Sequence, residues 1–422
     1  MRNIYTLLLY LLVPFVLLRL YLRSRKAPAY RQRWLERFAW KMNRANKPSI
    51  WLHAVSVGEV LGSAPLIQKL LDAYPQHQLV VTTMTPTGSD RVKELFGGQV
   101  LHCYAPYDLP GPVTRFLRAI RPELLILFET EIWPNTIHHC YRQNIPVLLA
   151  NGRMSARSAK GYQKLSGLTK SVMSELSLIA AQSEEDGLRF VDLGCPEKNV
   201  SVTGSVKFDL SIPEALKNDA ITLRSQWAGR PSFIAASTHQ GEDEQVLDAF
   251  AKIKHAYPDA LLVLVPRHPE RFDEVAQLIE EKDYNCIRRS TAQPVSSGCD
   301  VLLADSMGEL LLLYGCIDVA FVAGSLVPRG GHNMLEPAAW GVPILSGPHL
   351  FNFQAISELL RAAGALAVVE DSDALALKVI NLFADRKQAL QMGKFAEEVV
   401  KQNRGALDRQ FALIQTLMNR EE

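Results

Sequence analysis

From residue 50 onward, the chain alternates short apolar runs with longer amphipathic stretches. The apolar runs are six to eight residues long and rich in β-branched and aromatic side chains, and most end at small or polar residues suited to a loop or a helix cap. They lie at 50–57, 79–85, 100–107, 124–130, 147–152, 176–183, 200–205, 233–238, 261–268, 284–290, 300–306, 318–325, 342–347 and 365–370. Strands that alternate with helices in this way predict parallel sheets covered by helices on both faces.

The alternation pauses once, which predicts two domains. Residues 207–231 lack the strand pattern and predict an interdomain connection containing one helix. We therefore expect a domain over 30–206 and a second over 232–422, each Rossmann-like, preceded by an N-terminal segment at 1–29. In such sheets ligands bind beyond the carboxyl ends of the strands.

The N-terminus carries a different pattern. No charge interrupts the stretch from Ile4 to Leu18, and Arg19, Arg23, Arg25 and Lys26 follow it directly. Fifteen helical residues rise about 22 Å, less than the roughly 30 Å of a bilayer core, and 20–22 extend the stretch if Arg19 snorkels. A cleaved signal peptide carries its positive charge before the apolar stretch. The pattern therefore predicts a membrane anchor, with the remaining chain on the cytoplasmic side of that membrane.

Charge is divided unevenly along the chain. Residues 1–47 hold eleven basic side chains and one acid, Glu36, whereas the whole chain of 422 residues has a formal charge of only +2. The basic and aromatic residues of 30–47 predict an amphipathic stretch that lies on anionic headgroups; the alternative is a solvated helix whose aromatics dock on the body. The acidic remainder argues against nucleic-acid binding.

Metal and disulfide chemistry are not indicated. The six cysteines are far apart and form no CxxC pair, which is typical of reduced cytosolic thiols. The sequence His138-His139-Cys140 places adjacent side chains in different directions on a helix, so we expect no metal site there. We also expect no cofactor.

The most informative stretch of the second half is 324–348. A strand is followed by Gly330 and Gly331 and then by Asn333, which we expect to open a helix. Glycines allow the close approach of a ligand, and a helix start favours an anion such as phosphate. Glu336 could accept hydrogen bonds from a ribose diol, or it could pair with Asn333 as a capping box.

Two further strand ends of this half point to the same edge. Arg267 and His268 follow one strand, where a cation would neutralise a phosphate or carboxylate. Met307, Gly308 and Glu309 follow another, although Ser306 with Glu309 also matches a capping box. Together with 237–239 and the glycine-rich loop, these clusters predict one site for a charged nucleotide.

The first half presents carboxylates at strand ends. Glu59 follows the first strand and could serve as a general base or as the third residue of a capping box begun by Ser56. Glu129 and Glu131 are alternate residues, which we expect to share one face of an extended strand end. Lys207 closes another strand, where it could stabilise developing negative charge.

Many of these segments resemble one family. The segments on which the resemblance rests are HAVSVGEV, TTMTPTGSDRV, FETEIWPN, NGRMSARS, AQSEEDGLRF, VTGSVKFD, STHQGEDE, VPRHPERF, DSMGELLLLYG and GSLVPRGGHNMLEPAAWGVPILSGPH. Together they resemble the 3-deoxy-D-manno-octulosonic acid (Kdo) transferases of lipopolysaccharide assembly, over about residues 1–410.

The resemblance implies a GT-B glycosyltransferase fold, with CMP-Kdo as donor and the lipid A precursor, a tetraacyl disaccharide bisphosphate, as acceptor. It implies that Glu59 is the catalytic base and that Glu129 or Glu131, with Lys207, supports the transition state or acceptor. The segments implied to bind CMP are Arg267-His268, Met307 to Glu309 and Asn333-Met334-Leu335-Glu336. No essential Mg²⁺ is expected, because clustered carboxylates are missing from the donor side of the sequence.

Two other functions stay open from the residues. One keeps the tandem fold but uses a UDP-sugar, as a transferase or an epimerase. The other is a catalytically silent, membrane-tethered nucleotide-binding protein. The sequence leaves open the number of Kdo units transferred and whether the N-terminal helix spans the bilayer.

Overall fold

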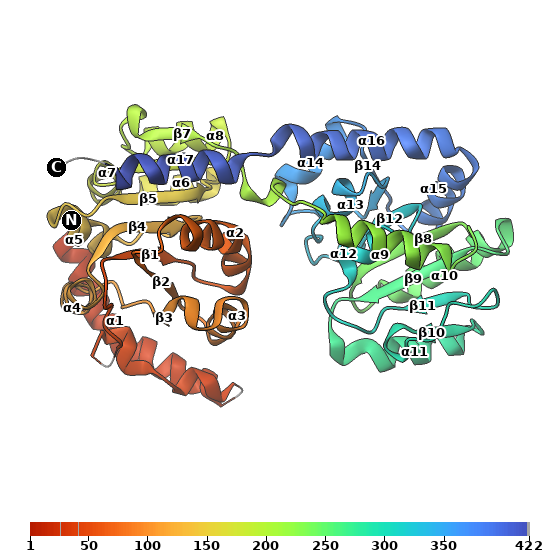
Figure 1. The fold of residues 1–422 in the computed structure, drawn as a ribbon, viewed down its shortest axis with the longest axis horizontal. Coiled ribbons are helices and arrows are strands. Elements are labelled where there is room, and N and C mark those ends of the chain that lie inside the picture. Colours follow the sequence, from red (N-terminus) through yellow and green to blue (C-terminus); the bar gives the residue numbers. More distant parts are fainter. Residues whose placement is uncertain (26, 41, 420–422) are drawn as a thin grey trace. The chain divides into compact units, whose positions relative to one another are not determined.

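A computed structural model describes residues 1–25, 27–40 and 42–419 and divides them into two compact units (Figure 1). Unit 1 contains Met1–Asp209 together with 404–419, and unit 2 contains Leu210–Asn403. Each of the fourteen apolar runs contains one strand, and every strand is parallel to its neighbours. The prediction of two Rossmann-like domains is therefore confirmed.

Unit 1 has a seven-stranded sheet in the order β3-β2-β1-β4-β5-β6-β7. Its strands are β1 (Ser49–His53), β2 (Gln78–Thr83), β3 (Leu101–Tyr104), β4 (Pro122–Phe128), β5 (Val147–Gly152), β6 (Leu178–Ala181) and β7 (Val200–Val202). Its helices after the N-terminal segment are α2 (Val57–Ala73), α3 (Pro86–Phe96), α4 (Pro110–Ile120), α5 (Pro134–Arg142), α6 (Ala156–Gln163), α7 (Ser166–Ser174), α8 (Glu184–Asp192) and α17 (Ala406–Met418), with short turns η3 (Gly97–Gln99), η4 (Glu197–Asn199) and η5 (Val206–Phe208).

Alternate residues of the strands fill two cores, one on each face of this sheet. In β4, Leu124 and Ile126 join the core made with α2, α3 and α17, whereas Leu125 and Leu127 join the core made with α4, α5, α7 and α8. A strand buried on both faces needs an unbroken apolar run, because its side chains alternate between the faces. This requirement explains why the strands were visible in the sequence.

Unit 2 repeats the arrangement with the order β10-β11-β9-β8-β12-β13-β14. Its strands are β8 (Ser232–Thr238), β9 (Leu261–Pro266), β10 (Cys286–Arg288), β11 (Val301–Leu303), β12 (Val319–Val322), β13 (Ile344–Ser346) and β14 (Leu366–Val368). Its helices are α9 (Glu214–Ser225), α10 (Asp243–Ala256), α11 (Phe272–Glu281), α12 (Leu310–Tyr314), α13 (Leu335–Ala339), α14 (Gln354–Ala362), α15 (Ser372–Ala384) and α16 (Arg386–Asn403), with turns η6 (Pro269–Arg271) and η7 (Arg289–Thr291). The single helix predicted within 207–231 is α9.

The last helix corrects the predicted boundary of the second domain. We expected residues up to 422 to belong to that domain, but α17 packs on unit 1, where Phe411, Ile414 and Leu417 join the core between α2 and the sheet (Figure 1). Asp209 accepts hydrogen bonds from the Gly405 and Leu407 N–H groups at the start of this helix. Because sequence periodicity shows that a helix face is apolar but not which sheet it covers, the sequence placed α17 in the wrong unit.

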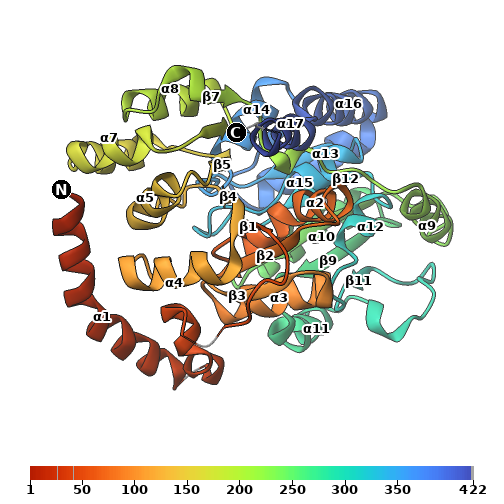
Figure 2. The same ribbon diagram turned by 60° about the vertical axis from the view of Figure 1, so that its left-hand side comes forward.

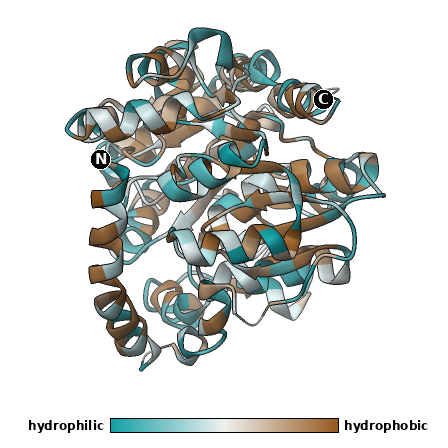
Figure 3. Cartoon of the chain, turned by 90° about the vertical axis from the view of Figure 1, so that its left-hand side faces the viewer, coloured by the Kyte–Doolittle hydropathy of each residue, from teal (hydrophilic) through white to brown (hydrophobic). Residues whose placement is uncertain are grey.

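The apolar N-terminal stretch forms α1 (Arg2–Ser24), which by length and composition could cross a membrane. Its first turns contact unit 1: the Tyr5 hydroxyl donates to Asp108 at 2.9 Å, and the Thr6 hydroxyl donates to the Asn135 side chain at 3.0 Å. From there α1 runs along one side of unit 1 (Figure 2), with most of its leucines exposed. The brown colouring in Figure 3 marks the apolar residues along this helix.

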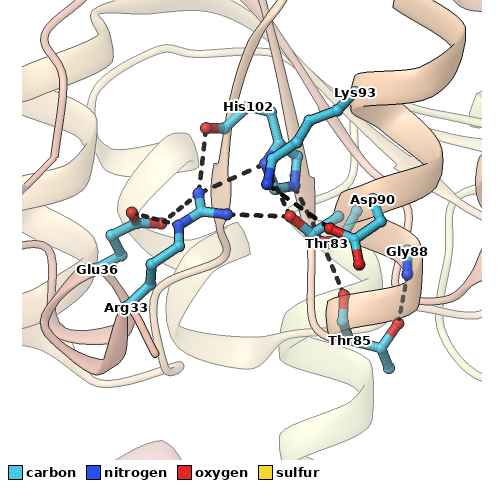
Figure 4. Close-up of polar contacts among 9 residues, drawn as sticks. Arg33, Glu36, Thr83, Thr85, Gly88, Asp90, Lys93 and His102 are labelled. Carbon is cyan, nitrogen blue, oxygen red and sulfur yellow. Dashed lines mark hydrogen bonds and ion pairs between the residues drawn. The ribbon is translucent and has the colours of Figure 1, made fainter. Parts of the chain in front are cut away.

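The basic segment after α1 is docked on unit 1 through two short turns, η1 (Pro28–Arg31) and η2 (Trp34–Phe38). Arg33 pairs with Glu36 at 2.7 Å and donates to the Ser89 hydroxyl at 3.0 Å and to the His102 carbonyl at 3.4 Å (Figure 4). Arg37 is buried over the Tyr104 ring.

These contacts change the sequence interpretation of 30–47. The described residues of this stretch form short turns in place of the solvated helix, and Arg33 and Arg37 donate within the protein. The docking of an aromatic side chain on the body does occur, since the Phe38 ring lies edge-on against Tyr107. Contact of the stretch with headgroups stays a prediction. Lys26 and Lys41, which we counted among the basic residues, lie outside the described residues.

Candidate functional site: the carboxyl edges of the two sheets

The strand order of unit 1 reverses between β1 and β4, which are neighbours. The chain proceeds from β1 outward to β3 on one side and from β4 outward to β7 on the other, so the loops after β1 and β4 diverge. Such a switch point is where open parallel sheets bind ligands. Glu59 follows β1, and Glu129 and Glu131 follow β4.

Glu59 sits in the first turn of α2. Its carboxylate accepts the Val55 N–H at 2.7 Å and the Ser56 hydroxyl at 3.0 Å. These bonds resemble half of a capping box, but Ser56 donates to Glu59 instead of capping a helix N–H. Burial raises the pKa of Glu59 against the opposing effect of these bonds, and the negative charge of Glu129 raises it further. The side chain is thereby fixed in position and made more basic.

Glu129 and Glu131 also lie at this edge of the sheet, but the backbone that carries them differs from the expected extended strand end. Strand β4 ends at Phe128, and Glu129 is left-handed at φ +63°, so the two residues do not share an extended strand face. The turn costs about 1 kcal/mol for a residue with a side chain, a strain often found at functional sites. Lys207 of η5 lies 3.8 Å from the Glu129 carboxylate, which places the predicted lysine at this edge.

The Glu131 carboxyl is strongly perturbed. Burial first, then the charges of Glu59 and Glu129, raise its pKa to about 7, although a hydrogen bond from the Trp133 indole at 2.8 Å acts in the opposite direction. The charge of Glu129 raises the pKa of Glu59, and the charges of Glu59 and Glu129 raise the pKa of Glu131. The three glutamates therefore form one electrostatic cluster.

The Glu131 pKa predicts a pH-dependent stability. Because the folded state holds this proton more tightly than the unfolded chain, the stabilisation is complete below about pH 4.5 and is lost as the pH rises through 7. Glutamine does not titrate, so the Glu131→Gln variant keeps its stability over this range. Relative to the wild type, we expect its free energy of unfolding to increase by about 2 kcal/mol between pH 5 and pH 8. Calorimetric melting across this range tests the prediction. The control is Glu123→Gln, which removes an exposed carboxyl at the other end of β4. Parallel curves of stability against pH for the wild type and Glu131→Gln would contradict the raised pKa of Glu131.

In unit 2 the order reverses between β8 and β12, and a pair of histidines bridges this point. His239 follows β8 and His332 lies in the loop after β12; their Nε2 atoms are 2.9 Å apart and their rings are stacked. The His268 ring, after β9, lies edge-on 5.3 Å from His239. Burial first, and then neighbouring positive groups that include Arg267, lower the pKa of His332 to about 4.

A buried carboxylate builds the loop that carries His332. Glu242 is fully buried and accepts the N–H groups of Gly324, Ser325 and Leu326 at 2.7–2.9 Å, as well as that of His239 at 3.0 Å. Gly324 has φ +70°, and a Cβ there would lie 2.7 Å from the His332 ring. The loop therefore depends on both Glu242 and Gly324.

Sequence reasoning missed Glu242 as a site residue and did not foresee the pairing of His239 with His332. His239 belongs to the predicted cluster 237–239, and His332 stands in the glycine-rich loop, but the pairing of their rings depends on the adjacency of β8 and β12, which only the strand order gives. Glu242 had no chemical signal of its own, because an acidic residue before a helix is usually read as part of a cap.

The predicted donor-side residues all lie along four adjacent strand ends, in the order β11, β9, β8 and β12. Arg267 and His268 follow β9, and Gly330, Gly331, Asn333, Met334, Leu335 and Glu336 follow β12. Gly330 has φ +99°, and any Cβ there would clash with Asn352.

The expected capping contact near Glu336 forms, but the helix differs. Asn333 donates to the Glu336 carboxylate at 3.0 Å and accepts the Leu335 N–H at 3.1 Å, while α13 begins at Leu335 and has only five residues. Its short length leaves little helix dipole to hold a phosphate. The cations Arg267 and Arg329 are a stronger source of positive potential at this edge, and the histidines, whose pKa values are lowered, add neutral N–H donors.

Met307, Gly308 and Glu309 follow β11. Glu309 accepts a hydrogen bond from Ser306 and pairs with Arg289 at 2.8 Å. Burial acts to raise the Glu309 pKa, but these bonds outweigh it and the pKa is lowered. Its carboxylate is therefore committed to local structure, while Met307 beside it is exposed. Among the described residues, no group of His, Cys, Asp or Glu could hold a metal ion.

Comparison with known proteins identifies the family of this chain. The family model described as 3-deoxy-D-manno-octulosonic-acid transferase matches residues 32–210, and the model of group 1 glycosyl transferases matches 233–399. The 3-deoxy-D-manno-octulosonic acid transferase of Haemophilus influenzae is 44% identical over 99% of both chains. This chain belongs to the Kdo transferase family. It is therefore a glycosyltransferase of lipopolysaccharide biosynthesis.

Further relatives agree. The 3-deoxy-D-manno-octulosonic acid transferase of Bordetella pertussis is 36% identical, covering 92% of this chain and 93% of its own. Among solved structures, a glycosyltransferase of Rickettsia africae matches with a TM-score of 0.57 at 15% identity, covering 89% of this chain and 100% of its own. At this identity the structure shows the fold alone, and that fold is the GT-B fold expected from the sequence.

Proposed function

We propose that the protein transfers Kdo from CMP-Kdo to the lipid A precursor with inversion at the anomeric carbon, and that Glu59 is the general base. The observation that carries the proposal is the cluster of three glutamates at the β1/β4 switch point in a member of the Kdo transferase family. Buried carboxylates held close together are more basic than free ones, as a general base near neutral pH requires.

The proposed step is a single displacement. A primary hydroxyl oxygen of the acceptor attacks C2 of Kdo and forms the new C–O bond, while the bond from C2 to the CMP phosphate oxygen breaks. Glu59 takes the hydroxyl proton, and CMP leaves with the bonding electrons. Glu59 is suited to this role because its two hydrogen bonds orient the carboxylate without neutralising it.

Glu129, Glu131 and Lys207 support the acceptor side in this proposal. The Lys207 ammonium beside Glu129 offers a cation for developing negative charge, and the charges of Glu59 and Glu129 raise the pKa of Glu131. Kinetics of the Glu129→Gln and Glu131→Gln variants would decide which of the two residues contacts the substrate.

On the donor side, unit 2 offers an edge suited to an anionic nucleotide sugar. Arg267 and Arg329 with the three histidines provide cations and N–H donors, and Asn333 to Glu336 offer polar groups for the ribose. The buried carboxylate of Glu242 is occupied by backbone N–H groups, so it does not repel the donor strongly. CMP-Kdo carries a phosphodiester and a carboxylate, which match this positive edge.

The helix α1 is proposed to lie along the inner-membrane surface on the cytoplasmic side. Its first turns are held by Asp108 and Asn135, and Arg33, nine residues after its end, is docked on the same unit. A helix held to one unit at both ends lies beside that unit, with its exposed leucines available to lipid. This arrangement would hold the catalytic unit near an acceptor that stays in the bilayer.

The function is tested by mass spectrometry of the products from purified full-length protein, CMP-Kdo and lipid A precursor. We expect the acceptor mass to increase by one or more Kdo residues, with no product from UDP-sugars. Transfer from a UDP-sugar alone would favour the alternative donor, and absence of any product would contradict the proposed transfer.

A further inference from the structure

A cavity of about 450 Å³ lies in unit 1 between the start of α1 and the helix α5, and none of the three glutamates described above lines it. Arg2 and Thr6 of α1 line one side, and Asn135, His138, His139 and Arg142 of α5 line the other. The volume lies within the range of small-molecule sites, about 300–1,000 Å³. No function described so far uses these residues.

The two arginines that line the cavity have no neutralising partner. No Asp or Glu lines it, and within the described chain neither the Arg2 nor the Arg142 side chain forms a hydrogen bond or ion pair. The helix α5 also supplies His138 and His139; burial first, and then the charges of His138 and Arg2, lower the pKa of His139, so it offers a neutral N–H. Unpaired positive charge around a recess concentrates anions there.

The two nearest carboxylates are already occupied. Asp108 accepts the N–H groups of Asn135 and Thr136 at the start of α5 and the Tyr5 hydroxyl. Glu175 accepts from His138 Nδ1 at 2.8 Å. The second bond fixes the His138 ring and leaves its Nε2 without a partner among the described residues.

The position of the cavity on α1 identifies the kind of anion. The helix leaves the cavity at Arg2 and continues with the exposed apolar side chains Ile4, Leu7, Leu8 and Leu11. An amphiphile with an anionic head and acyl chains matches this sequence of a basic recess followed by an apolar surface. The guanidinium group of an arginine binds two phosphate oxygens through two parallel N–H donors.

We propose that the cavity formed by Arg2, His138, His139 and Arg142 binds the phosphate group of an anionic membrane phospholipid, whose acyl chains follow α1. This site shares no residue with the proposed transfer site and would hold the first turn of α1 at the level of the headgroups.

Titration calorimetry of the full-length protein with monomeric dihexanoyl phosphatidic acid tests this site. We expect binding that weakens with added NaCl and that falls about tenfold or more in Arg142→Gln, because a charge-assisted bond to phosphate is lost. Arg118→Gln on the neighbouring helix α4 is the matched control, since Arg118 is exposed and removes the same charge outside the cavity. His139→Gln provides a second variant inside it, with a smaller expected loss, because the lowered pKa leaves this imidazole neutral.

Two comparison ligands separate the possible outcomes. Inorganic phosphate that binds as tightly as the short-chain lipid would make the cavity a site for free phosphate and overturn the lipid assignment. Dihexanoyl phosphatidylcholine that binds equally well, or equal losses in Arg142→Gln and Arg118→Gln, would overturn the anion site itself. Kdo transfer in detergent is expected to be unchanged in Arg142→Gln, so failure of this proposal is distinguishable from failure of the proposed function.

Discussion

Replacing Glu59 by glutamine is expected to lower kcat for Kdo transfer by about 10²–10⁴-fold, with little change in CMP-Kdo affinity. The amide keeps the size of the side chain and an oxygen that can accept the Val55 N–H, so the first turn of α2 should be preserved. It cannot take a proton from the acceptor hydroxyl. Steady-state kinetics give kcat, and calorimetry with CMP-Kdo gives donor affinity.

Glu123→Gln is the control for the loss of one carboxylate. Glu123 lies at the start of β4, the opposite end from the glutamate cluster, and its exposed pair with His77 contributes little to stability. Turnover near the wild-type level in Glu59→Gln would reject the base assignment. A larger loss in Glu131→Gln than in Glu59→Gln would transfer that role to Glu131, whose pKa of about 7 also suits a base.

Replacing Glu242 by glutamine is expected to destabilise unit 2 by about 2–4 kcal/mol and to weaken CMP binding by more than tenfold. One carboxylate oxygen accepts Ser325 and Leu326, and the other accepts Gly324 and His239. In a glutamine one of these oxygens becomes an NH₂ group that faces two N–H donors. Those donors are left buried without acceptors, and the loop that presents His332 loses its anchor.

Glu244→Gln separates this effect from a general loss of charge on α10. Glu244 is exposed two residues further along, whereas Glu242 is fully buried. Thermal melting measures stability, and calorimetry with CMP measures the site. Equal melting temperatures for the two variants would show that Glu242 does not organise the loop, and intact CMP affinity in a destabilised Glu242→Gln would separate the loop from the donor site.

The two sheets were predictable because burial on both faces forces a visible apolar run at every strand. The expected site residues were also visible, since polar residues directly after such runs must lie at the carboxyl edge of a parallel sheet. The route of Glu129 was not predictable: a left-handed turn at a residue with a side chain has no signal in its neighbours. The docking of Arg33 and Arg37 on unit 1 was not predictable for a related reason, because composition cannot show which cations donate within the protein.

The sequence alone determined the fold class, the family resemblance and the strand ends at which chemistry is expected, because these follow from local patterns of burial and from motifs. Only the tertiary structure decided which of those ends are neighbours. The adjacency of β1 with β4 brings Glu59 to the other glutamates, and that of β8 with β12 pairs His239 with His332. The return of α17 to unit 1 and the docking of α1 at Asp108 were decided in the same way, since contacts between residues distant in the sequence depend on how whole elements pack.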